Sequence, residues 1–126
     1  MSYSIFLQRF AQGKPAPLDE AATLEVLHPF IVAQDSTSVF IRARDGSEAE
    51  IYRDPSGLMI DRPEQGGIFD IVAELINRLD VVLLSPGGPT ILRCEADRSH
   101  LPNEFQNDAI VVELSGAAIQ CAIESF

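Results

Sequence analysis

Residues 38–61, SVFIRARDGSEAEIYRDPSGLMID, constrain the fold more than any other segment of this chain. Apolar and polar side chains alternate through three runs, which are separated by DG at 45–46 and by DPSG at 54–57. Alternation with a period of two is typical of a β-strand with one buried face, and Gly, Pro and Asp are the residues that short turns favour. The segment therefore predicts a three-stranded antiparallel meander.

The register of this meander can be predicted from its side chains. Centring the first turn on position 46 places Arg42 opposite Glu50 and Phe40 opposite Tyr52. A type I turn over DPSG then places Tyr52 opposite Met59. A shift of one residue would exchange the two faces of a strand, so a register that keeps apolar residues together is preferred.

The two faces of the predicted meander differ in character. One face carries only apolar residues, which we expect in the core: Val39, Ile41, Ala43, Ala49, Ile51, Leu58 and Ile60. The other face carries Phe40, Tyr52 and Met59, with Arg42 and Glu50 beside them. Aromatic residues, Met and Arg are enriched at the centres of protein interfaces. These five residues are our candidate partner-binding face, unless the second helix or the N-terminal strand covers them.

Helical periodicity is clearest over residues 66–79, GGIFDIVAELINRL. Its apolar residues recur at intervals of three and four: Ile68, Ile71, Val72, Leu75 and Leu79. A shorter helix is predicted over residues 18–27, with Ala21, Leu24 and Leu27 on its inner side and Pro29 beyond its end. The GG pair at 66–67 lacks the Lys and Ser/Thr of a phosphate-binding loop, so we interpret it as a flexible helix start.

Strands are expected at both ends of the chain. Residues 4–10 alternate as a first strand, and residues 109–115 and 117–126 are predicted to form a hairpin that turns at 115–116 and places Cys121 in the core. The whole pattern predicts a single α+β domain over residues 1–126, with a mostly antiparallel sheet and two helices packed on one face.

The charge balance restricts the class of partner. Nineteen acidic residues against nine basic ones give a formal net charge of −10. Nucleic acids and anionic membrane surfaces would repel such a chain, whereas a basic protein would be attracted. The opening residues have no basic segment followed by a long apolar run, so we expect no secretory signal, and the longest apolar run, VVLL, is too short to span a membrane. With two cysteines and a core that needs no disulfide, we expect a reduced, cytoplasmic protein.

A second candidate site lies in residues 81–102, VVLLSPGGPTILRCEADRSHLP. Its candidate pocket residues are Ser85, Gly87, Gly88, Cys94 and His100. A nucleophile elbow needs glycine two residues before the serine, where this chain has leucine, and nothing in the spacing forces the thiol and the imidazole together. One Cys and two distant His residues also do not make a zinc site. We therefore predict no catalytic residue, metal or cofactor, and we interpret PGGP as a turn.

The opening MSYSIFLQRF, followed by a Gly/Pro connection and a short helix, resembles the start of small bacterial proteins of uncharacterised function that open with MSYD and an aromatic strand. In size, acidity and order of elements the chain is also similar to toxin-immunity proteins. That resemblance implies a small cytosolic α+β domain that blocks a cognate toxin, and it transfers no individual residue.

The sequence thus leaves three hypotheses. The first is a binding protein of immunity or inhibitor type that acts on a basic protein partner through the face of Phe40, Tyr52 and Met59. The second is a small enzyme or ligand-binding protein with its site between Ser85 and His100. The third is a homo-oligomer that pairs through the exposed edge of the predicted C-terminal hairpin.

Overall fold

The computed structural model describes residues 4–124 of the chain. Its main strands are β1 (Ser4–Gln8), β4 (Ile31–Gln34), β5 (Ser38–Arg42), β6 (Glu48–Asp54), β7 (Gly57–Asp61), β8 (Val82–Leu84), β9 (Thr90–Leu92) and β10 (Ala109–Val111). They form one sheet in the order β10-β9-β8-β1-β7-β6-β5-β4, antiparallel except for the parallel pair β9/β10. A separate small hairpin joins β2 (Phe10–Ala11) to β3 (Lys14–Pro15).

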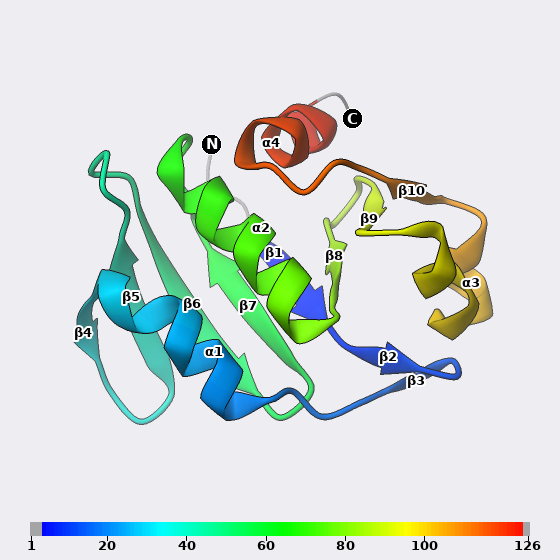
Figure 1. Ribbon diagram of the computed structural model, residues 1–126, viewed down its shortest axis with the longest axis horizontal. Helices are drawn as coiled ribbons and strands as arrows, with labels where there is room; N and C mark the ends of the chain where they lie inside the picture. Colours follow the sequence, from blue (N-terminus) through cyan, green and yellow to red (C-terminus); the bar gives the residue numbers. More distant parts are fainter. Residues whose placement is uncertain (1–3, 125–126) are drawn as a thin grey trace.

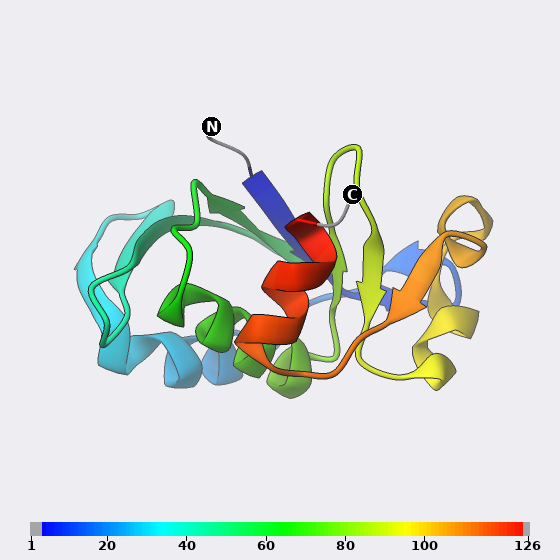
Figure 2. The same cartoon turned by 90° about the horizontal axis from the view of Figure 1, so that it is seen from above.

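The helices of the described residues are α1 (Glu20–Leu27), α2 (Gly67–Leu79), α3 (Asn103–Gln106) and α4 (Gly116–Glu124), with two 3-10 helices, η1 (His28–Phe30) and η2 (Glu95–His100). Figures 1 and 2 show α1, α2 and α4 on the same side of the large sheet. The chain is therefore a single α+β domain with a mostly antiparallel sheet, as predicted. The expectation of only two helices is wrong.

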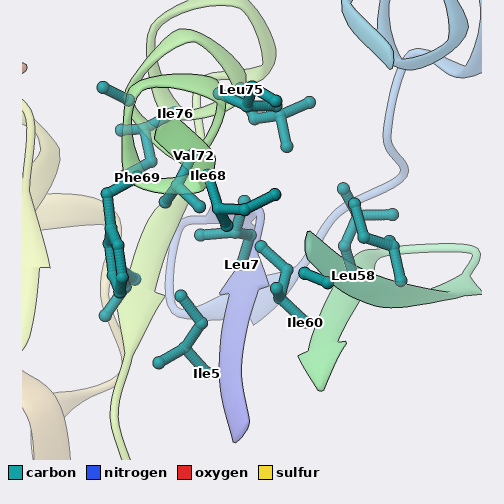
Figure 3. Close-up of a cluster of buried hydrophobic side chains, with 14 of the residues drawn as sticks. Ile5, Leu7, Leu58, Ile60, Ile68, Phe69, Val72, Leu75 and Ile76 are labelled. Carbon is teal, nitrogen blue, oxygen red and sulfur yellow. The ribbon is translucent and has the colours of Figure 1, made fainter. Parts of the chain in front are cut away.

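The main core lies between this sheet and α2. Ile5 and Leu7 of β1 and Ile60 of β7 are fully buried beneath Ile68 and Val72 of α2 (Figure 3). Every residue predicted for the inner face of the meander is also buried. Apolar residues recur every three to four positions in α2 and at every second position in the strands, so each element has one apolar side. These sides pack against each other and form one continuous core.

The meander forms, but the register of its first hairpin differs from the prediction by two residues. Arg42 faces Glu48 rather than Glu50, and Phe40 faces Glu50 rather than Tyr52. The cause is the position of the turn, which comprises residues 44–46 and is centred on Asp45 rather than on Gly46. Gly46 adopts a positive φ of 89°, and the Ala43 N–H donates to the Ser47 carbonyl at 2.8 Å. A shift of two residues keeps each side chain on its predicted face.

The second hairpin has the predicted register, with Tyr52 facing Met59. Strand β4, which no sequence pattern indicated, pairs with β5 and forms one edge of the sheet. In α1 the predicted inner stripe is partly wrong: Leu27 is buried as predicted, together with Thr23 and Val26, whereas Ala21 and Leu24 are exposed, Leu24 by 39%.

The largest difference lies at the C-terminus, where α4 replaces the second strand of the predicted hairpin. The Ser115 hydroxyl accepts the Ala118 N–H at 3.1 Å, and Asp70 of α2 accepts the Gly116 N–H at 3.1 Å, so both groups cap the helix start. Ile119 is fully buried against the main core, but Cys121 is exposed, which contradicts its predicted core position. Residues 1–3 of the MSYD-like opening and 125–126 of the predicted last strand lie outside the described residues.

The opposite face of the sheet is covered at one end only. A second apolar cluster there joins Val82, Leu92, Leu101 and Ala109, with Phe10, Leu84 and Phe105 packed against them. In Figure 2 no helix of the described residues lies over this side of β1 and β5–β7. We call this uncovered side of β1, β5, β6 and β7 the open face.

Candidate functional site

An apolar row runs across the open face, perpendicular to the strands. Leu84 of β8 pairs with Phe6 of β1, Phe6 pairs with Met59 of β7, and Met59 pairs with Tyr52 of β6. Phe6 and Tyr52 are each 37% exposed, and Met59 and Leu84 are half-buried. We call these four residues the apolar row. The second helix and the N-terminal strand, which could have covered this face, leave the apolar row open. Helix α2 packs on the other side of the sheet, and β1 extends the row.

The sequence placed only part of this row. Tyr52 and Met59 are neighbours as predicted, whereas Phe40 is half-buried one row away, opposite Glu50. Phe6 was missed, although its position between Ile5 and Leu7 already assigned it to the face opposite the core. What the sequence did not contain was the pairing of β1 with β7, which brings Phe6 beside Met59.

Two carboxylates border the apolar row. Glu50 of β6 and Asp61 of β7 are direct cross-strand partners, and we call them the carboxylate pair. The Tyr52 hydroxyl donates to Glu50, and the Ser4 hydroxyl donates to Asp61 at 2.9 Å. The hydrogen bond to Glu50, partial desolvation and the negative charges of Glu50, Asp61 and Asp35 raise the pKa of Tyr52. The potential at the row is therefore negative.

The arginines near the carboxylate pair do not neutralise it. Arg42, which was predicted to face Glu50, instead binds Glu48 through Nε at 2.7 Å and Nη2 at 2.6 Å. Arg62 lies 4.0 Å from Asp61 and its side chain is 75% exposed, which is the geometry of a weak surface contact. Of the predicted binding residues, Arg42 therefore forms an internal ion pair, while Glu50 and Tyr52 share a hydrogen bond on the open face.

The second predicted site separates into two places. Ser85, Gly87 and Gly88 line an open groove of about 1010 Å³, which we call the loop groove, together with the loop between β5 and β6, residues 62–65 and the end of α4. Cys94 and His100 lie outside it. His100 holds the tip of the β2–β3 hairpin, since its Nδ1 accepts the Gln12 N–H at 3.3 Å and its carbonyl accepts the Gly13 N–H at 2.9 Å.

Cys94 is an exposed free thiol that directly precedes η2. No hydrogen bond connects it to His100 in the described part of the chain. The arrangement therefore provides no thiol–imidazole pair of the kind that a cysteine nucleophile requires.

The start of α2 is already occupied by side chains of the protein itself. The Asp45 carboxylate accepts the Gly67 N–H at 2.8 Å, and the Ser47 hydroxyl accepts the Ile68 N–H at 3.1 Å. Hydrogen bonds from Ser47 and from the Gly67 N–H lower the pKa of Asp45. A carboxylate therefore sits where a phosphate would bind, which supports the interpretation of GG at 66–67 as a structural helix start.

Other signs of a chemical site are few among residues 4–124. They form no group of three or more His, Cys, Asp or Glu side chains suited to holding a metal ion. Every buried side-chain nitrogen or oxygen that the structure describes has a hydrogen-bond partner. No helix within this part of the chain is long and apolar enough to cross a membrane. A further groove of about 710 Å³ lies between α1, α2, α4 and the loop between β5 and β6. The open face and the loop groove contain site residues predicted from the sequence, and they are our two candidate sites.

Comparison with known proteins adds no relative to this geometry. No protein-family model, curated protein or solved structure matches the chain.

Proposed function

We propose that this chain is a protein-binding domain of immunity or inhibitor type that acts in the cytoplasm and neutralises a basic protein partner, such as a toxin, through its open face. The observation that carries the proposal is the exposed apolar row beside an unneutralised carboxylate pair. Large apolar side chains that gather on an uncovered surface with charged residues at their border are typical of protein interaction sites.

The charge of the surface selects the class of partner. Glu50 and Asp61 lie beside the row, and the whole chain has a formal net charge of −10. A nucleic acid or an anionic membrane would be repelled, whereas a basic protein would be steered toward the face. A second copy of this chain would place like charges against each other, so the charge argues for a different partner.

Affinity capture from the host lysate, followed by mass spectrometry, tests the proposal. The wild-type chain should capture a basic protein that the double variant Phe6→Ala/Tyr52→Ala loses. The matched control is Leu24→Ala, since Leu24 is similarly exposed at 39% but lies on α1, on the other side of the sheet. Equal capture by all three folded proteins would contradict a binding role for the open face.

A second candidate function, binding of a small ligand, is favoured by the volume of the loop groove, about 1010 Å³, and by the position of Ser85 on its wall. It predicts that a small-molecule screen will find a compound whose binding raises the melting temperature of the wild type and not that of Ser85→Phe, which would obstruct the groove. A screen in which every stabilising compound acts equally on both proteins would count against it.

A further inference from the structure

We infer that the carboxylate pair is a receptor for an arginine side chain of the partner, whose guanidinium group lies between Glu50 and Asp61 and against the ring of Tyr52. This inference rests on the proposed function and names the group that the open face recognises.

The first argument is the position of the two charges. Glu50 and Asp61 lie directly opposite each other on neighbouring strands, where side chains are about 5 Å apart at Cβ and like charges are destabilising. The nearest basic groups compensate the charge of the pair only weakly, because Arg42 is bound to Glu48 and Arg62 reaches no closer than 4.0 Å to Asp61. A cation from outside the chain would remove this repulsion.

The second argument is what surrounds the pair. Glu50 has Phe40 opposite it on β5 and Tyr52 two positions along its own strand, while Asp61 has Met59 two positions along β7. Tyr52 is 37% exposed and its hydroxyl donates a hydrogen bond to Glu50, which holds the phenol group next to the carboxylate. Apolar surface and negative charge therefore meet at one point of the open face.

This combination favours a guanidinium over an ammonium group. A guanidinium group is planar, donates several N–H bonds in fixed directions and can bind two carboxylates while its face stacks on an aromatic ring. An ammonium group is more strongly hydrated and offers no flat face, so it gains less from Tyr52. The site should therefore distinguish arginine from lysine.

Titration of the full-length, isotope-labelled chain with hexa-arginine and hexa-lysine peptides, followed by amide NMR spectra, tests the inference. Hexa-arginine should shift the signals of β1, β6 and β7 and bind at least tenfold more tightly than hexa-lysine. Glu50→Gln/Asp61→Asn should weaken hexa-arginine binding at least tenfold. Glu104→Gln/Asp108→Asn is the matched control, because it removes two exposed charges on and beside α3, away from the open face, and should keep binding close to that of the wild type.

A second readout separates recognition from a structural role. If the pair is held for a ligand, Glu50→Gln/Asp61→Asn should raise the melting temperature of the free protein while it weakens peptide binding, since the amides still accept the Tyr52 and Ser4 hydroxyls. Equal binding of the two peptides, equal losses in the two charge variants, or no binding at all would overturn the inference.

The outcome also separates this inference from the proposed function. If Phe6→Ala/Tyr52→Ala loses the captured partner while Glu50→Gln/Asp61→Asn retains it, the open face still binds a protein but the arginine site is wrong. If neither variant affects capture, both proposals fail.

Discussion

The two faces of strands β1 and β7 have different environments, although consecutive residues of each strand alternate between them. Leu7 and Ile60 point into the core and are fully buried, whereas their neighbours Phe6 and Met59 point to the open face, where Phe6 is 37% exposed. Residues of similar size therefore lie on both sides of one sheet, and only one side is covered by α1, α2 and α4. The comparison shows that apolar character alone does not mark the core of this domain.

The same contrast exists along the opposite face itself. Near β8 to β10 the chain covers this face with Leu101 and Phe105, and Phe10 packs against Phe105 with a ring-centroid distance of 6.2 Å. Over β5, β6 and β7 no segment of the described chain provides such a cover. The apolar row begins in the covered part, at Leu84, and continues into the uncovered part, at Tyr52. The uncovered part is the surface that we assign to a partner.

The largest expected effect on stability is a difference between Ile60 and Met59, which are neighbours in β7 but lie on opposite faces of the sheet. Ile60→Ala removes a fully buried side chain and should lower the free energy of unfolding by about 2–5 kcal/mol. Met59→Ala removes a half-buried side chain from the open face and should lower it by no more than about 1 kcal/mol. Urea denaturation of both variants measures the difference. Equal losses would show that the open face is part of the core.

A smaller effect is expected where the helical layer packs most tightly. A Cβ atom at Gly116 would lie 2.6 Å from the backbone nitrogen of Asp70 and closer still to its carboxylate. Gly116→Ala should therefore separate α4 from α2 and reduce the free energy of unfolding by about 1–3 kcal/mol. Ala117→Ser, at the next and exposed position, should change it by less than about 0.5 kcal/mol. Binding at the open face should persist in both variants, since neither touches it.

The smallest effect concerns the cap of α2 and depends on pH. Hydrogen bonds lower the pKa of Asp45 in the folded protein from its ordinary value of 3.8, so the ionised carboxylate stabilises the fold at pH values above 3.8. This stabilisation is lost as the pH falls through the lowered folded pKa. Asp45→Asn should therefore lower the melting temperature by a few degrees at pH 7, and the difference from the wild type should shrink toward pH 3. A difference that is the same at both values would contradict an electrostatic cap.

Local patterns predicted the elements whose partners are close in sequence. The alternation around DPSG gave the β6–β7 register, and the spacing from Ile68 to Leu79 gave α2. The first hairpin was misplaced by two residues because its turn is centred on Asp45 and not on Gly46, a detail that DG alone does not specify. The C-terminal helix was missed because residues 117–123 are apolar enough for a strand, and the cap from Asp70 that fixes its start is distant in sequence.

The candidate site was harder to predict than the fold. Tyr52, Met59 and Glu50 could be assigned to one face from alternation within a single meander. Asp61 belongs to the same meander, and its pairing with Glu50 follows from the predicted β6–β7 register. Phe6 joined them only through the pairing of β1 with β7, which crosses more than fifty residues of sequence. Cys94 and His100, six residues apart, were considered together, yet tertiary structure places them in different surroundings.

Hydroxyl-radical footprinting of the complex with the captured basic protein is the most direct measurement of whether the open face is the binding surface. Phe6, Tyr52 and Met59 should become protected when the partner binds, while Leu24 on the helical side should be modified at the same rate in the free and bound protein. Protection of Leu24 or of the residues around Ser85, with Tyr52 and Met59 unchanged, would contradict the assignment of the open face.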